Sequence, residues 1–128
     1  MSDRIISTSS APAAIGPYSQ GVRVGDLVFL SGQIPLDPTT MSVVEGDIRQ
    51  QAEQVMKNMA AVAAAAGGSL DDSVKLTIFL TDLSDFTVVN EVMAEYFQPP
   101  FPARSTVQVA GLPRGVAIEI EAILSLPG

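Results

Sequence analysis

The chain has 128 residues and a formal net charge of −7, with no histidine and no cysteine. These absences exclude disulfides, thiolate nucleophiles, Cys-ligated metal sites and triads that need histidine. The 7 basic residues never adjoin one another, so we expect no nucleic-acid partner, because such binding needs clustered Lys and Arg. We also expect a cytoplasmic protein without a membrane segment, since no apolar run nears ~18 residues and the start lacks a signal-peptide core.

Short β-strands are predicted for the first part of the chain. Residues 4–7 are expected to form an edge strand, and a proline-containing loop follows. The runs 19–24 and 27–31 flank Gly25 and Asp26, a pair typical of a two-residue hairpin turn. The sequence therefore predicts three strands before the first helix.

A long amphipathic helix is predicted next. Asp47 has the character of an N-cap, with Gln50 three residues later in the capping-box position, and Gly67 ends the pattern. Apolar residues recur at helical spacing and define one stripe. They are Ile48, Ala52, Val55, Met56, Met59, Val62, Ala63 and Ala66. The methionines on this stripe are interpreted as core residues and not as a ligand groove, because they share it with Val and Ala.

A strand and a second helix follow. Residues 74–80 alternate between two sets of side chains, which is typical of a strand. Asp82 or Ser84 is expected to cap the second helix, which must end before Pro99. Its inward face is expected to carry Phe86, Val89, Met93, Tyr96 and Phe97.

Two more strands are predicted in the C-terminal part. Prolines precede Arg104 and hold its backbone in an ordered turn, after which residues 104–109 alternate. A turn at 111–113 leads to a second alternating run that carries Glu119 and Glu121. Such strands can bring the guanidinium and one or two carboxylates to the same side of a sheet. The competing interpretation is an exposed sheet face with ordinary solvated charges.

The element order β-β-β-α-β-α-β-β predicts one domain over residues 1–128. We expect a two-layer α+β fold, with about six strands in a mixed sheet and two helices packed on one face. The other face would carry Thr77, Phe79, Thr106 and Ile123. The chain has no further element to cover that face, so self-association is predicted.

Three sequence blocks carry a resemblance to a known family. FPARSTVQVAGLP with IEIEAI, and the earlier APAAIGPYSQG and SGQIPLDP, resemble the motifs of the Rid family of reactive intermediate deaminases, also called YjgF. The resemblance runs from about residue 5 to residue 124, nearly the whole chain. It implies a chorismate-mutase-like (YjgF-like) fold and a homotrimer whose sheets face inward, with ligand clefts between subunits.

The resemblance also implies an activity. Members hydrolyse reactive 2-imino or enamino acids, such as 2-iminobutanoate and 2-iminopropanoate, to 2-oxo acids and ammonia, without metal or cofactor. Carried onto this chain, Arg104 would hold the substrate carboxylate and Glu119 would place and activate water, with Glu121 as the rival. The remaining family pocket positions would shape the site or hydrogen-bond the substrate. They are Tyr18, Ser31, Gly32, Asn90, Ser105 and Thr106.

Other interpretations stay open from the sequence. Tyr18 fits a half-buried core aromatic, Ser31 and Gly32 fit a strand end, and Asn90 fits an exposed helix position. Many members have cysteine where this chain has Thr106, which leaves substrate preference open. The alternative functions are a non-catalytic trimer that binds small carboxylates such as 2-oxo acids and, less favoured, an endoribonuclease or translation inhibitor. The net charge of −7 and the absence of histidine argue against the last.

Overall fold

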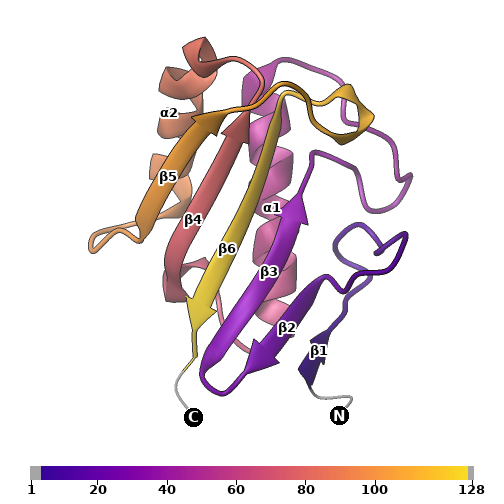
Figure 1. Cartoon of the computed structure of the whole chain (residues 1–128), viewed down its shortest axis with the longest axis vertical. Coiled ribbons are helices and arrows are strands. Elements are labelled where there is room, and N and C mark those ends of the chain that lie inside the picture. Colours follow the sequence, from indigo (N-terminus) through magenta and orange to yellow (C-terminus); the bar gives the residue numbers. More distant parts are fainter. Residues whose placement is uncertain (1–3, 127–128) are drawn as a thin grey trace.

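One mixed sheet with two helices on one face makes up the computed structural model, which describes residues 4–126. The strands are β1 (Ile5–Ile6), β2 (Gly21–Val24), β3 (Leu27–Gln33), β4 (Ser73–Leu80), β5 (Ala103–Gln108) and β6 (Ile118–Ser125). Their spatial order is β1-β2-β3-β6-β4-β5 (Figure 1). Only β4 and β5 pair in parallel among these strands, and β5 is an edge. The predicted fold class and element order are confirmed.

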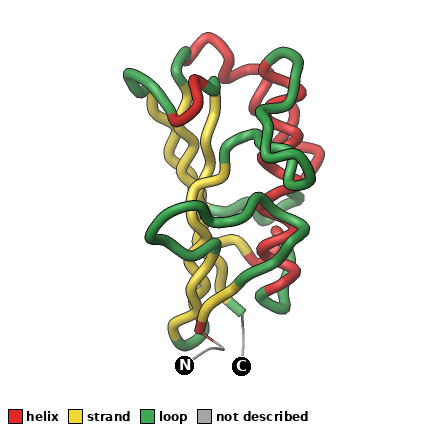
Figure 2. Tube along the Cα trace, turned by 90° about the vertical axis from the view of Figure 1, so that its right-hand side faces the viewer, coloured by secondary structure: helices red, strands yellow, loops and turns green. Residues whose placement is uncertain are grey.

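The helices α1 (Ile48–Ala65) and α2 (Phe86–Tyr96) cover the same side of the sheet, as Figure 2 shows. The predicted capping box of α1 is confirmed. The Asp47 carboxylate accepts from the Arg49 and Gln50 backbone N–H groups, and the Gln50 side chain accepts from the Asp47 N–H. Asp82 was expected to cap α2, but it caps the short 3₁₀ turn Leu83–Asp85 that precedes the helix. Its carboxylate accepts from the Ser84 N–H at 2.9 Å. Neither helix in residues 4–126 is long and apolar enough to cross a membrane.

The hydrophobic core lies between this sheet face and the helices. It takes alternate side chains from the two central strands and the inward stripe of α1. Leu76, Ile120 and Met56 are all 0% exposed, and Met59 is equally buried. The interpretation of the methionines as core residues is confirmed. Each such side chain stabilises the fold by roughly 1.5–3 kcal/mol through removal of apolar surface from water.

The opposite sheet face has no covering layer in residues 4–126. Leu27 and Phe29 of β3 and Val107 of β5 stay 40%, 41% and 41% exposed on it. Thr77, Phe79 and Ile123 lie on this open face, as predicted, but Thr106 does not. Thr106 pairs with Ile78, whose side chain is buried under the helices, so the expected placement of Thr106 is wrong.

Candidate active site

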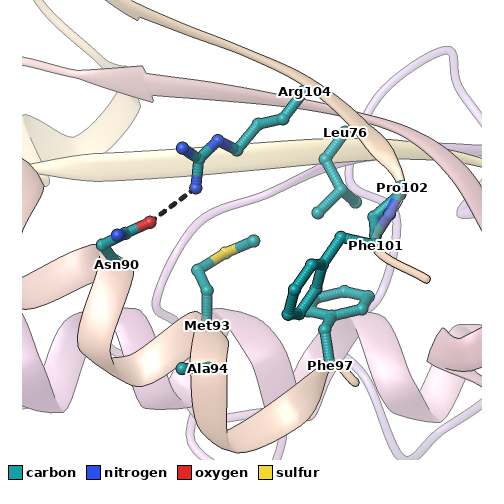
Figure 3. A pocket seen from close by; sticks show the side chains of 8 residues that line it. All are labelled: Leu76, Asn90, Met93, Ala94, Phe97, Phe101, Pro102 and Arg104. Atoms are coloured by element: carbon teal, nitrogen blue, oxygen red, sulfur yellow. Dashed lines mark hydrogen bonds between the residues drawn. The ribbon is translucent and has the colours of Figure 1, made fainter. Parts of the chain in front are cut away.

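Arg104 lies near the start of the edge strand β5, on the helix side of the sheet. It pairs with Leu76 of β4, whose side chain is buried beneath α2. Its Nη1 donates a hydrogen bond of 2.6 Å to Asn90 Oδ1, and its guanidinium carbon lies 5.0 Å from the ring centroid of Phe86 (Figure 3 shows the Asn90 contact). Phe86 and Asn90 are four residues apart on α2, so they share one helix face.

An apolar pocket of about 420 Å³ opens beside this arginine. Figure 3 shows that its wall comes from α2, from β4 and from the loop before β5. Besides Arg104 and Asn90, the pocket is lined by Leu76, Met93, Ala94, Phe97, Phe101 and Pro102. Within residues 4–126 no carboxylate oxygen lies within 4.0 Å of Arg104, so its charge is available to an outside anion. An apolar cavity with a few polar groups at its edge is typical of a small-molecule site.

Glu119 lies near the start of β6, where its side chain packs over the backbone of Gly32. A Cβ at position 32 would overlap the carboxylate and lie only 2.9 Å from its carbon, so the close approach depends on glycine. Burial raises the pKa of Glu119 above its ordinary value, and the nearby charge of Glu121 raises it further. A carboxylate with a raised pKa is better suited to accept and return a proton near neutral pH.

The structure places Arg104 and Glu119 on opposite faces of the sheet. Both strands flank β4, where Arg104 pairs with Leu76 and Glu119 pairs with Phe79. Because Leu76 and Phe79 are three positions apart in one strand, their side chains point in opposite directions. The expectation that one chain holds guanidinium and carboxylate on the same side is therefore wrong. The predicted alternation within each strand is confirmed. Which residues of different strands share a face depends on the register between those strands.

The other predicted residues divide between the two regions. Asn90 is exposed on α2, as its alternative interpretation expects, and its Oδ1 accepts from Arg104. Thr106 also faces the helices, where its Oγ1 is buried without a hydrogen-bond partner. Gly32 belongs with Glu119. Ser105 pairs with Thr77 on the open face, and Lys75 Nζ lies 3.4 Å from its Oγ.

Tyr18 and Ser31 lie at the N-terminal side of the sheet. The Ser31 hydroxyl donates to the Ser19 carbonyl at 2.5 Å, and its backbone N–H donates to the Gln20 carbonyl. Tyr18 is exposed (52%) and does not belong to the core or to the residues packed against it, so the competing interpretation of a core aromatic is wrong. It lines a second hollow of about 440 Å³ together with Ser19, Gln20 and residues of the first loop.

Phe86 is the site residue that the sequence interpretation missed. It was expected to serve only the core, and it does pack against it while its ring also faces the guanidinium. The available signal was its spacing of four residues from Asn90 on the predicted helix.

These features define a class: an α+β protein with a small-molecule pocket, an adjacent arginine that has no carboxylate partner among the described residues, and a partly buried glutamate on the far sheet face. A family model described as Endoribonuclease L-PSP matches residues 8–125. The 2-iminobutanoate/2-iminopropanoate deaminase of Dermatophagoides farinae is 53% identical over 94% of each chain. Protein DfrA of Myxococcus xanthus is 57% identical, covering 96% of this chain and 95% of its own.

The fold comparison agrees with the sequence comparisons. The crystal structure of RidA from an Antarctic Psychrobacter species has a TM-score of 0.91 and 55% identity, covering 94% of this chain and 98% of its own. The chain therefore belongs to the YjgF/Rid family, as its three sequence blocks predict. Curated members of this family include deaminases.

Proposed function

We propose that this protein hydrolyses 2-imino and enamino acids, such as 2-iminobutanoate and 2-iminopropanoate, to 2-oxo acids and ammonia. The observation that carries the proposal is Arg104: an unpaired guanidinium, held by Asn90 and Phe86, beside an apolar pocket. Such a group binds a carboxylate through two parallel hydrogen bonds. The similarity to curated deaminases supports the same substrate class.

The chemistry needs only a bound water and a proton carrier. With the carboxylate on Arg104, the C2 of the imine is held for attack. Glu119 takes a proton from the water as its oxygen bonds to C2, and the C=N electrons move to nitrogen. Glu119 returns this proton to the nitrogen, which gives a carbinolamine. Glu119 then carries the hydroxyl proton to the amine, so that the C2–N bond breaks, ammonia leaves and the 2-oxo group forms. Proton transfer of this kind contributes about 10²–10⁴-fold, and the raised pKa of Glu119 suits it.

The opposite placement of Arg104 and Glu119 means that a site using both must combine two copies of the chain. We propose a homotrimer in which the β5 edge of one copy lies against the open face of the next. The exposed apolar residues of that face, such as Leu27 and Phe29, support such a contact. Repeated head-to-tail contacts form a ring when the rotation between successive copies closes, and the proposed trimer is the case of three copies.

A complementation experiment tests this arrangement. Arg104→Ala and Glu119→Gln chains are co-expressed with different tags, and mixed assemblies are purified by both tags. Each variant alone should be nearly inactive in releasing ammonia from 2-iminobutanoate generated in situ. Each mixed trimer that carries both tags should have about a third of its sites restored, since only one of its three contacts joins an unaltered Arg104 to an unaltered Glu119.

Two results would contradict the proposal. Absence of any recovery in well-folded mixed assemblies would contradict the shared site, and undiminished activity of Arg104→Ala alone would contradict the role of its guanidinium. A third result would favour a non-catalytic carboxylate-binding trimer: 2-oxobutanoate binding that needs Arg104, with no imine hydrolysis by the unaltered protein. RNA cleavage in the same preparations is not expected, because an acidic chain without histidine repels the substrate and lacks the usual general base.

A further inference from the structure

The surroundings of Arg104 show why its side chain lies where it does. A free arginine side chain has many rotamers, and fixing one of them costs free energy at the moment of binding. Here the side chain already has two partners on α2, namely the Asn90 oxygen and the Phe86 ring. The helix is in turn anchored to the core through the buried Val89 and Met93.

We propose that Phe86 and Asn90 are positioning residues that preset the Arg104 guanidinium for a carboxylate. Phe86 supports the planar cation through a cation–π contact, and Asn90 fixes its rotation within that plane. The inference rests on the proposed function, since it concerns how the same arginine meets its substrate. It assigns Asn90 a role on Arg104 in place of a direct contact to substrate.

The hydrogen-bond inventory of the guanidinium supports this assignment. Arginine has five N–H donors, and Asn90 uses one, on Nη1. No group in the described part of the chain bonds to the edge formed by Nε and Nη2, and that edge can make two parallel bonds to a carboxylate. Asn90 suits this task because a neutral amide accepts a bond without cancelling the positive charge. An aspartate at the same place would pair with the arginine and compete with the substrate.

The distance to Phe86 fits the same role. A guanidinium carbon 5.0 Å from the ring centroid lies within the about 6 Å range of a cation–π interaction. The ring is itself partly buried against the core, so it is a fixed surface. Tyrosine would retain the ring face, whereas leucine would retain apolar packing and remove the π system.

The test compares four variants by 2-oxobutanoate binding in calorimetry and by the KM and kcat of imine hydrolysis. Phe86→Leu should weaken binding and raise KM by about 2–5-fold with little change in kcat, and Phe86→Tyr should restore both. Asn90→Ala should weaken binding by about 3–10-fold, and Asn90→Asp should weaken it more, through charge competition. Thermal unfolding of each variant establishes a temperature at which all of them are folded.

A matched control separates positioning from packing. Tyr96→Leu removes another aromatic ring of α2 that packs against the core and, among residues 4–126, makes neither a hydrogen bond nor a cation–π contact with Arg104. It should lower the unfolding temperature and leave 2-oxobutanoate affinity unchanged. If Phe86→Leu behaves like Tyr96→Leu, or if Asn90→Ala binds as the unaltered protein does, the inference is wrong. If Arg104→Ala itself binds 2-oxobutanoate normally, the proposed function fails instead, and the two failures remain distinct.

Discussion

The two faces of the sheet carry similar apolar side chains, but the helices cover one face and leave the other exposed to solvent. On the helix face Leu76 and Ile120 are fully buried, whereas on the open face Phe29 is 41% and Val24 55% exposed. The same strands supply both sets, since alternate residues point in opposite directions. The comparison shows that period-two patterning identifies the members of a face, but what covers the face depends on other elements or other chains.

The residues of the proposed site divide between the two faces in the same way. Arg104 lies on the helix face with Phe86 and Asn90, and Glu119 lies on the other face over Gly32. Each face therefore supplies half of the proposed chemistry. The helix face holds the proposed carboxylate-binding group, Arg104, and the open face holds the proposed proton carrier, Glu119.

The largest effect on the free energy of unfolding is expected when a buried side chain on the helix face of the sheet is shortened. Ile120→Ala should lower the free energy of unfolding by about 2–5 kcal/mol, because it leaves a cavity where no water can enter. Phe29→Ala on the open face should cost less, about 1 kcal/mol or below for the separated chain, since its ring is already partly in water. Urea titrations at several protein concentrations measure both.

Protein concentration sharpens this test. If chains assemble through the open face, the cost of Phe29→Ala should grow with concentration, because truncation then weakens a contact between copies. The cost of Ile120→Ala should be much less dependent on concentration. Equal costs for the two variants in the separated chain would contradict the difference between the faces.

Much of the fold follows from local signals in the sequence. The capping box at Asp47 and Gln50 sets the start of α1, and alternation locates the two C-terminal strands to within about three residues. These features depend on neighbours along the chain. The core methionines could be assigned for the same reason, because helical spacing alone places Met56 and Met59 on the buried stripe.

The sides taken by Arg104 and Glu119 could not be predicted in this way. They depend on the parallel register of β5 against β4 for Arg104 and on the antiparallel register of β6 against β4 for Glu119. A shift of one residue in the register of β5 would move Arg104 to the other face. The buried Thr106 hydroxyl without a hydrogen-bond partner and the contact of Phe86 with Arg104 depend on the register of β5 against β4, so the sequence alone could not predict them.

The next largest effect on stability is expected at Gly32, with a greater effect on activity. Gly32→Ala should displace the Glu119 carboxylate and reduce imine hydrolysis at least about tenfold, while costing about 1 kcal/mol of stability. The stability cost is small because the end of the glutamate can rotate away. Gly111→Ala is the matched control, since an added Cβ there meets nothing within 4 Å. Similar activities of the two variants would show that the placement of Glu119 does not matter.

A pH-dependent effect should distinguish Glu119 from ordinary surface carboxylates. Because burial and Glu121 raise the pKa of Glu119 above 4.5, the folded state binds its proton more tightly than the unfolded chain does. The resulting stabilisation is complete below the unfolded pKa and is lost as pH rises through the folded pKa. Glu119→Gln removes this dependence, so the stability of the natural chain relative to the variant should fall over that pH interval.

Urea titrations of both chains from acidic to neutral pH measure this difference. The sign of the change in relative stability with pH decides the test, since a carboxylate stabilised by a salt bridge would gain stability as pH rises. A relative stability that rises with pH would contradict the desolvated environment of Glu119. Glu121→Gln should reduce the dependence only in part, because the Glu121 charge is the lesser of the two causes.

The smallest effect on stability is expected at Thr106, on the sheet face that the helices cover. Its Oγ1 is buried without a partner, so the hydroxyl is desolvated with no hydrogen bond in return. Thr106→Val keeps the shape and removes this defect, so stability should be unchanged or higher by up to about 1 kcal/mol. Thr106→Ser keeps the hydroxyl and removes a methyl group, and should lower stability by about 1 kcal/mol. A clear loss in the valine variant would mean that the hydroxyl has a partner in the assembled protein, which would place Thr106 at a contact between chains.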